Sequence, residues 1–251
     1  TDGQVLTSGG AGAAPAWETV AGGLTGKVEG TNFTNSLLVG HSTTGTLDAA
    51  TSNTGVGIDC LDALTTGDQN TAVGNDAMTA TTTGYQNVGV GVNALYYNIG
   101  GKENVAIGYG AKQNNTTGDA NTAIGFTSLL VTSGNKNIGI GYQAGNNITS
   151  GDGNVVIGNA DVASATGDDQ LSISDGEDGS VVWMTGDSSA KLTFPGALQV
   201  SGAVTVGVDD TGLDVKLFGA SAGSYLEWDE SADQLRIMGA SADATTSTGK
   251  L

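Results

Sequence analysis

The sequence predicts an all-β protein whose central part is a parallel β-roll, a β-solenoid of eight coils. Three observations predict this fold class. Glycines recur every 17 residues, apolar residues alternate with a period of two just before them, and the 251 residues include 42 glycines and only 5% aromatic residues. So much glycine removes packing surface and disfavours helices. A fixed period is typical of a solenoid, in which each repeat forms one coil.

Residues 1–30 precede the repeats. They are rich in glycine and alanine and contain only a short apolar stretch, so we expect an extended, glycine-rich leader. The sequence begins at Thr1 without methionine and ends at Leu251 within a repeating pattern. We therefore expect the chain to be a piece of a longer protein.

Residues 31–165 carry the repeat, and its most regular member is an anchor glycine at the end of a short apolar stretch. Successive anchors are 17 residues apart, with one interval of 16. Chance does not produce this regularity, so each interval is interpreted as one coil. The eight anchors are Gly40, Gly57, Gly74, Gly91, Gly108, Gly125, Gly141 and Gly158.

The three positions before each anchor predict a short strand. The residue directly before the anchor is always Val or Ile, and the residue two positions earlier is mostly Thr, Val or Ile. A period of two places both on one strand face, which we expect to be the core. The position between them is Ala or Gly in six copies, which predicts close approach of a neighbouring chain on the opposite face. Because few side chains per coil point inward, a lone roll needs partner chains for stability.

Other repeat positions predict turns and packing. A second glycine stands seven residues before most anchors, where we expect a turn with positive φ. Side chains three residues after the anchor are small and include Cys60, which we interpret as a packed residue and not a reactive thiol. The asparagine that starts most repeats is expected to bond turn backbone or to form a ladder along the roll. Lys112 is expected at the surface.

Residues 166–251 are predicted to form a second, smaller β-rich module that continues beyond the chain. The 17-residue period stops near residue 166, and short alternating runs between Gly- or Asp-rich turns replace it. Trp228 is expected to pack across strands against Leu235 or Ile237, and a sugar-binding role for Trp228 is the alternative. The runs are 170–174, 181–184, 191–194, 198–208, 213–218, 225–228 and 234–238.

The charge balance excludes several classes of function. The chain has 26 acidic and 8 basic residues, a net charge of −18, which repels phosphate backbones and anionic membranes. We therefore expect no nucleic-acid partner. The sequence has no run of 18 apolar residues and no signal-peptide pattern, so we expect no membrane insertion. With one cysteine, an internal disulfide is excluded.

Catalytic and metal chemistry find little support in the sequence. The adjacent acidic pairs 168–169, 209–210 and 229–230 stand in Gly- or Ser-flanked turns, where solvated loops are expected and not the paired carboxylates of a glycoside hydrolase. His41 is the single histidine, and with Cys60 it makes no zinc cluster. Calcium-binding repeat patterns are absent, and a weak cation site at 175–179 is the alternative. We predict no catalytic, cofactor-binding or metal-binding residues and no cofactor.

The repeats resemble the head repeats of trimeric autotransporter adhesins of the YadA type. The resemblance covers residues 35–162 and rests on the core Asn-x-Ala/Gly-Val/Ile-Gly, as in Asn104-Val-Ala-Ile-Gly108, with an alanine three residues later. It implies a left-handed parallel β-roll that assembles as a homotrimer. The period of 17 is longer than the usual head repeat of that family, and no neck or membrane anchor is recognisable downstream.

Two flanking segments resemble phage tail fibres and other virion appendages. They are residues 2–18 and residues 208–235, the second including Tyr225-Leu-Glu-Trp228. The resemblance implies a viral structural protein, a homotrimeric fibre segment on the virion that spaces or presents a host-attachment surface. Its implied partners are other virion proteins and a host cell-surface glycan or protein. The alternatives are a bacterial trimeric adhesin head at the cell surface and a polysaccharide-degrading tailspike; no enzymatic activity is expected.

Overall fold

The structure is a computed structural model in which two compact units are distinguished, Thr1–Ala197 and Leu198–Leu251. It describes residues 4–7, 16–19, 26–30, 33–39, 48–201, 215–218, 225–229 and 234–238. These ranges contain strands, turns and bends and no helix, so none of them crosses a membrane as a helix.

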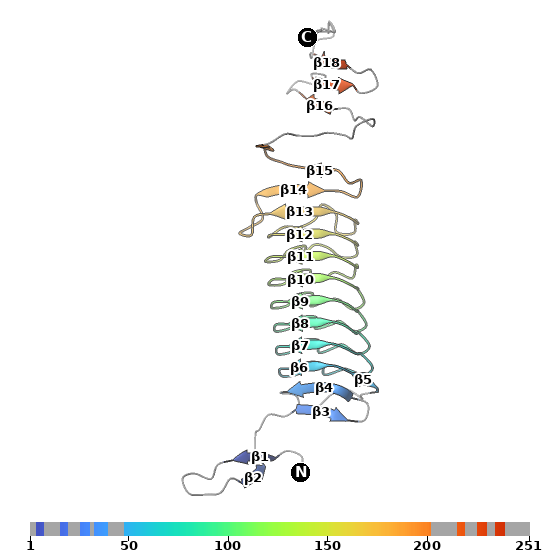
Figure 1. Cartoon of the computed structure of the whole chain (residues 1–251), viewed down its shortest axis with the longest axis vertical. Helices are drawn as coiled ribbons and strands as arrows, with labels where there is room; N and C mark the ends of the chain where they lie inside the picture. The colour runs from blue at the N-terminus through green and yellow to red at the C-terminus, as the bar shows by residue number, and fades with distance from the viewer. Residues whose placement is uncertain are drawn as a thin grey trace. The chain divides into compact units, whose positions relative to one another are not determined.

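The first unit contains the predicted parallel β-solenoid, with one short strand per coil of about 17 residues (Figure 1). Each strand pairs in parallel with the same repeat positions of the next coil, so that Ala106 lies opposite Gly89 on one side and Ala123 on the other. Identical positions therefore stack along the roll. The strands are β6 (Thr54–Val56), β7 (Thr71–Val73), β8 (Val88–Val90), β9 (Val105–Ile107), β10 (Thr122–Ile124), β11 (Ile138–Ile140), β12 (Val155–Ile157) and β13 (Leu171–Ser174).

Antiparallel strands continue the sheet at both ends of the roll. At one end β3 (Gly26–Gly30) pairs antiparallel with β4 (Phe33–Val39), which itself pairs in parallel with β5 (Ala50–Thr51) and with β6. At the other end β14 (Val182–Gly186) pairs with β13 and with β15 (Leu192–Thr193). These strands cover edges that would otherwise offer unpaired backbone groups. The expected boundary at 165/166 lies inside this sheet, between β12 and β13, whereas the first compact unit ends at Ala197 and the second begins at Leu198.

Part of the expected leader also forms a hairpin of its own. Strand β1 (Gln4–Thr7) pairs antiparallel with β2 (Ala16–Thr19). The strand β3, which begins at Gly26, lies within the same expected leader and belongs to the large sheet. The described residues among the first 30 therefore form three strands.

The inward and outward faces of the strands are the reverse of those predicted. The Ala/Gly position points into the coil, and Ala72, Ala106 and Ala123 are completely buried. The Val and Ile on either side of it point outward, and Ile107 is 40% exposed. The Ala/Gly position therefore packs within its own chain and is not available to a neighbouring one.

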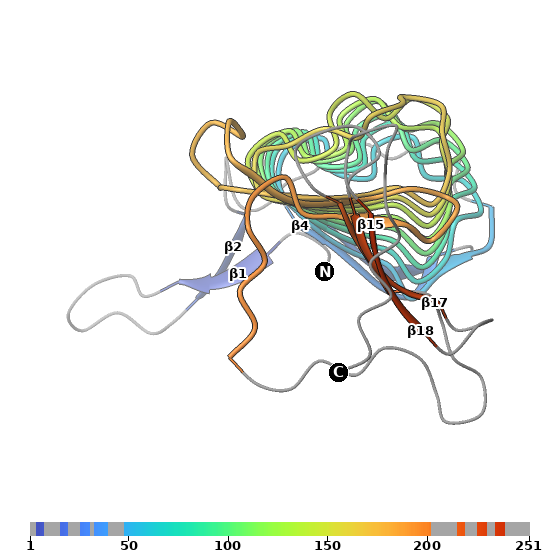
Figure 2. The ribbon, with the colours of Figure 1, turned by 90° about the horizontal axis from the view of Figure 1, so that it is seen from above.

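The thinness of each coil explains this reversal. Viewed along the roll, the strands form one layer and the turn segments a second layer close behind it (Figure 2). A side chain added at Gly139 would lie 2.8 Å from Leu129 Cγ, and one at Gly89 would lie 3.0 Å from Met78 Cγ. From β6 to β11 the space between the layers is filled from the turn side, so only Ala or Gly fits on the strand side. In β12 the buried Val156 occupies this position, where the turn side has Gly145 in place of a large residue. The larger core residues on the turn side include Leu61, Met78, Leu95 and Leu129.

Glycine is required at the anchor positions for two reasons, a positive φ angle and a close backbone contact with the next coil. From Gly57 to Gly158 their φ angles lie between +101° and +142°, a region that L side chains rarely adopt. A Cβ at Gly74 would also lie 2.7 Å from the carbonyl carbon of Gly91 in the next coil. Gly40 lies outside the described residues.

The second set of glycines does not have the predicted positive φ. Gly84 and Gly101 are not among the residues of the described chain that have a positive φ. Close contacts with the next coil explain instead why glycine is required at these positions. A Cβ on Gly101 would lie 2.7 Å from the carbonyl oxygen of Gly118. Positive φ angles occur at non-glycine residues in each coil, for example Asn93 at 60° and Leu95 at 52°.

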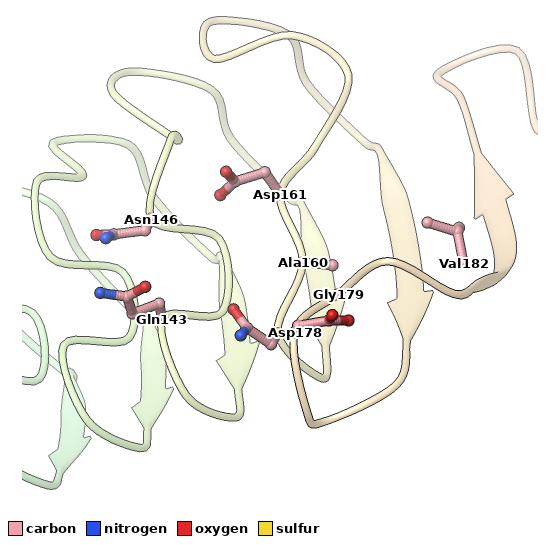
Figure 3. A pocket seen from close by; sticks show the side chains of 8 residues that line it. Gln143, Asn146, Ala160, Asp161, Asp178, Gly179 and Val182 are labelled. Carbon is pink, nitrogen blue, oxygen red and sulfur yellow. The ribbon is translucent and has the colours of Figure 1, made fainter.

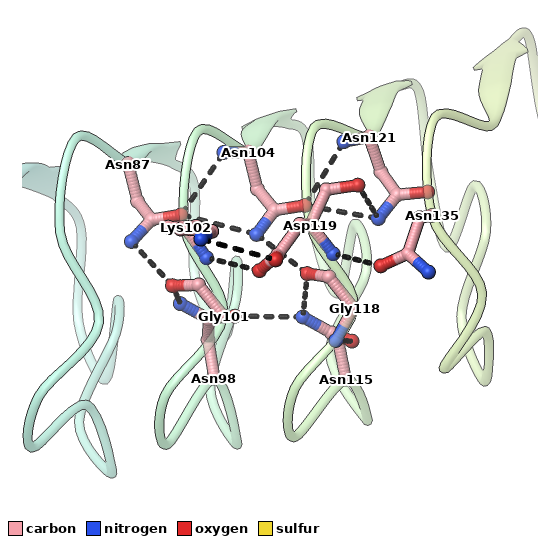
Figure 4. Close-up of polar contacts among 10 residues, drawn as sticks. All are labelled: Asn87, Asn98, Gly101, Lys102, Asn104, Asn115, Gly118, Asp119, Asn121 and Asn135. Carbon is pink, nitrogen blue, oxygen red and sulfur yellow. Dashed lines mark hydrogen bonds and ion pairs between the residues drawn. The ribbon is translucent and has the colours of Figure 1, made fainter.

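The repeat asparagines form the predicted ladder, and it is buried (Figure 4). Asn104 donates its side-chain NH₂ to Asn87 Oδ1 at 3.1 Å and to the Gly118 carbonyl at 2.9 Å. Its own Oδ1 accepts from the backbone N–H of Asn121 at 3.0 Å. Ser36 stands at the start of the ladder and Gln170 at its end. The ladder runs through Asn53, Asn70, Asn87, Asn104, Asn121, Asn137 and Asn154.

The second unit contains an antiparallel sheet of three described strands. They are β16 (Val215–Phe218), β17 (Tyr225–Asp229) and β18 (Gln234–Met238), in the order β16-β17-β18. The register places Trp228 opposite Leu235, which agrees with the predicted pairing of these two strands. The side chain of Trp228 lies outside the described part, and so does the run 202–208.

Candidate binding surfaces of the roll

The outward Val and Ile residues make one side of the roll an apolar sheet face. Residues directly before the anchors stack on one another from coil to coil, with Val73 opposite Val90 and Ile107 opposite Ile124. Several of them are about two-fifths exposed, which is unusual for β-branched residues in ordered strands. We call this surface the Val/Ile face. It comprises Val56, Val73, Val90, Ile107, Ile124, Ile140 and Ile157, together with Val88, Val105, Ile138 and Val155, which stand two positions before four of them; Thr54, Thr71 and Thr122 hold that second position in the other coils.

An aromatic ladder borders the Val/Ile face. Tyr109, Phe126 and Tyr142 directly follow successive anchors, and each is between 43% and 50% exposed. Their ring centroids are 5.3 and 5.2 Å apart, and the rings are almost parallel. Sequence reasoning missed this ladder, although aromatic residues one position after three successive anchors are a readable signal.

A polar hollow of about 340 Å³ lies next to the last coils of the roll (Figure 3). Gln143 and Asn146 come from the turn after β11, Asn159 and Asp161 from the turn after β12, and Asp178 from the loop between β13 and β14. The lining contains two carboxylates, three carboxamides and no Lys or Arg. This hollow was not predicted, because it forms where a non-repeating loop folds against the last coils.

Acidic side chains form a second, exposed ladder along the turns. Asp119 Oδ1 accepts from the backbone N–H of Lys102 at 3.0 Å, and Asp152 Oδ1 accepts from that of Asn135 at 2.6 Å. Asp168 Oδ1 accepts from the backbone N–H of Asp152 at 2.8 Å. Lys102 also forms an ion pair with Asp119 at 3.7 Å (Figure 4). These carboxylates hold turn backbone in place, as expected for a solvated loop at 168–169.

Among the described residues of the roll, Cys60 and Lys112 are buried titratable groups. Cys60 is buried as predicted, and desolvation raises the pKa of its thiol to about 11, which disfavours the reactive thiolate. Lys112 is completely buried, so its expected surface position is wrong. Its ammonium group donates to the carbonyl oxygen of Thr132 at 3.2 Å, and burial lowers its pKa to about 7.

The described residues bring together no group of three or more His, Cys, Asp or Glu side chains that would suit a metal ion. Asp168 and Asp169 are exposed in a turn. The loop 175–179 is organised by Asp175, whose Oδ1 accepts from the backbone N–H of Gly179 at 2.7 Å. His41, Asp209, Asp210 and Glu230 lie outside the described part of the chain.

Comparison with known proteins finds no matching family model, no matching curated protein and no matching solved structure.

Proposed function

We propose that this chain is a non-enzymatic, structural and adhesive segment of a virion fibre, most simply a phage tail fibre. In this proposal it forms a homotrimer on the virion and spaces or presents a surface that binds the host. The observation that carries the proposal is the Val/Ile face, a continuous apolar strip along one side of a long stack of coils.

The Val/Ile face supports self-association. Parallel sheets normally have both faces covered, and contiguous exposed apolar patches mark interaction sites. On this face, equivalent residues repeat at every coil from β6 to β12. A second copy running in the same direction presents the same repeat, so side chains match level by level along the whole roll. Three copies around one axis cover all three Val/Ile faces and give a symmetric fibre.

The stack of coils supports a spacer role. Coils of parallel strands follow one another about 4.8 Å apart, so length grows in proportion to the number of repeats. Hydrogen bonds join successive coils in both layers, for example from Thr71 N–H to the Asn87 carbonyl at 2.8 Å and from Met78 N–H to the Ala94 carbonyl at 2.9 Å. Because every coil is hydrogen-bonded to the next, such a stack keeps a fixed distance between its two ends without a large core.

Immunogold labelling tests the assignment directly. Antibodies are raised against the 251-residue chain. They are applied to virus particles and to cells, both taken from a culture in which the gene of this chain is present. We expect gold on appendages of virus particles, at a fixed distance from the particle body. Gold on the cell envelope with unlabelled particles would contradict the proposal and assign the chain to a bacterial surface adhesin.

A further inference from the structure

The polar hollow beside the last coils is a preformed cavity. The loop between β13 and β14 forms one wall, and the roll holds this loop in place. Asn159 donates its backbone N–H to the Asp175 carbonyl at 2.8 Å and its side-chain NH₂ to the Glu177 carbonyl at 3.2 Å. Gly179 packs so closely on Asn159 that a Cβ would overlap the carbonyl oxygen of Asn159. A rigid wall lowers the entropic cost of ligand binding.

Several polar atoms of the lining have a fixed position and a remaining capacity for hydrogen bonds. Asp161 accepts from the backbone N–H of Asn147 through Oδ1 at 3.0 Å, which leaves Oδ2 for a ligand. Asp178 accepts from the backbone N–H of Ser180 through Oδ1 at 2.9 Å, and hydrogen bonds from Ser180 lower the pKa of this carboxyl. Asn159 Oδ1 and the side chain of Gln143 have no hydrogen bond to other described residues.

This set of atoms selects one chemical class of ligand. Two carboxylates and the absence of Lys and Arg from the lining disfavour phosphate, sulfate and carboxylate groups. Carboxylate oxygens accept only, whereas the amides of Gln143, Asn146 and Asn159 donate and accept. Hydroxyl groups also donate and accept, so a neutral polyhydroxyl molecule satisfies both kinds of lining atom.

The aromatic ladder gives the hollow a neighbouring apolar contact surface. Tyr142 immediately precedes Gln143, and Asn159 occupies the repeat position that Tyr142 holds one coil earlier. The ladder Tyr109–Phe126–Tyr142 therefore runs along the roll to the edge of the hollow. An extended ligand that enters the hollow can lie along exposed ring edges with its carbon-bound hydrogens.

We propose that the hollow binds a neutral saccharide of the host cell surface, with Gln143, Asn159, Asp161 and Asp178 as hydrogen-bonding residues. The inference rests on the proposed adhesive function and names its ligand class. It also places the site on the roll itself, next to the last coils, independently of the second unit.

A glycan microarray tests this inference with the full chain. The probes are neutral gluco-, galacto- and manno-oligosaccharides and their sialylated and sulfated counterparts. We expect binding to at least one neutral series and none to its anionic counterparts. Gln143→Ala removes a side chain that has no structural hydrogen bond, and we expect it to weaken neutral-glycan binding at least tenfold with an unchanged melting temperature. Asp161→Asn keeps an Oδ1 acceptor for Asn147 and is expected to weaken binding as well.

Asn93→Ala is the matched control. Asn93 occupies the same repeat position as Gln143, three coils earlier, and the φ angles of 60° and 55° are similar. We expect this variant to bind glycans as the wild type does. Equal binding by the Gln143→Ala chain, a preference for anionic glycans, or binding that chelation of calcium abolishes would each overturn the inference.

Failure of this inference is distinguishable from failure of the proposed function. A Gln143→Ala chain that remains trimeric and still adheres to host cells would overturn the saccharide site and leave the fibre function in place. A wild-type chain that neither trimerises nor adheres to cells would overturn the fibre function.

Discussion

Lys112 occupies a core position that is apolar in the neighbouring coils. Leu95 lies in the same repeat position one coil before it and Leu129 one coil after it. Burial lowers the pKa of Lys112 to about 7, although the carboxylate of Asp119 acts in the opposite direction. The folded chain therefore disfavours the protonated amine, whereas the unfolded chain keeps a pKa near 10.5.

The stability of the roll should consequently depend on pH through Lys112. Between pH 7 and 10.5 the unfolded state binds more protons than the folded state, so stability rises with pH; below pH 7 the penalty is constant. We expect Lys112→Met to stabilise the chain by about 1 to 4 kcal/mol at pH 7, and this gain should shrink towards pH 10.5. Thermal melting at several pH values measures it.

Lys102→Met is the control for this prediction. Lys102 is exposed and pairs with Asp119 on the turn surface. The same substitution there should change the melting temperature little at any pH. Equal pH profiles for wild type and Lys112→Met would show that the ammonium group reaches water.

The asparagine ladder is the element that ties the coils together inside the roll. Removal of one member leaves a buried backbone N–H without an acceptor, which costs about 1 to 3 kcal/mol, and it also breaks further hydrogen bonds to neighbouring coils. Asn104→Ala removes the acceptor of the buried Asn121 N–H. It also removes one of the two donors to Asn87 Oδ1, which keeps the Asn104 backbone N–H, and one of the two donors to the Gly118 carbonyl, which keeps Asn115. We expect a loss of about 2 kcal/mol or more in a denaturant titration.

Asn114→Ala serves as the control in the same coil, because Asn114 is exposed. A surface substitution of this kind is expected to change stability by about 0.5 kcal/mol or less. If the two variants unfold at the same denaturant concentration, the ladder does not contribute to stability as its geometry indicates.

The Val/Ile face is the element on which the proposed assembly depends. Val73 lies on this face and Val131 lies in a turn segment, and both are 38% exposed. We expect Val73→Asp to shift the chain from trimer towards monomer, because it places three carboxylates at one level of the interface. Val131→Asp should leave the trimer intact. Size-exclusion chromatography with light scattering compares them, and equal masses for the two variants would locate the interface elsewhere.

At the scale of the whole molecule, the spacing of the anchor glycines was sufficient to predict the solenoid. Each interval closes one coil, and equal intervals stack equal positions, so the parallel register follows from the sequence. The asparagine ladder and the burial of Cys60 were predicted on the same basis. These features depend only on which positions repeat.

The orientation of the strands was not predictable from the alternation alone. A period of two separates Val105 and Ile107 from Ala106 but does not say which set points inward. Hydrophobicity favours the larger residues inside, yet the narrow space behind the strand admits only Ala or Gly there. The signal lay in the turn segment, where Met78, Leu95 and Leu129 repeat in one position and fill that space. The same column would have placed Lys112 in the core.

The polar hollow has no counterpart in the repeat, so periodicity could not reveal it. Asp178 comes from a loop that follows the last coil, whereas Gln143 and Asn159 belong to earlier turns. Their proximity depends on how that loop folds back, which Asp175 fixes through local hydrogen bonds.

The central claim, that copies of this chain cover one another's Val/Ile faces, is tested most directly by sedimentation equilibrium of the wild-type chain. Three chains of 24.8 kDa give a predicted mass of about 74 kDa that does not fall on dilution into the micromolar range. A stable, folded species of 24.8 kDa at the same concentrations would contradict the account.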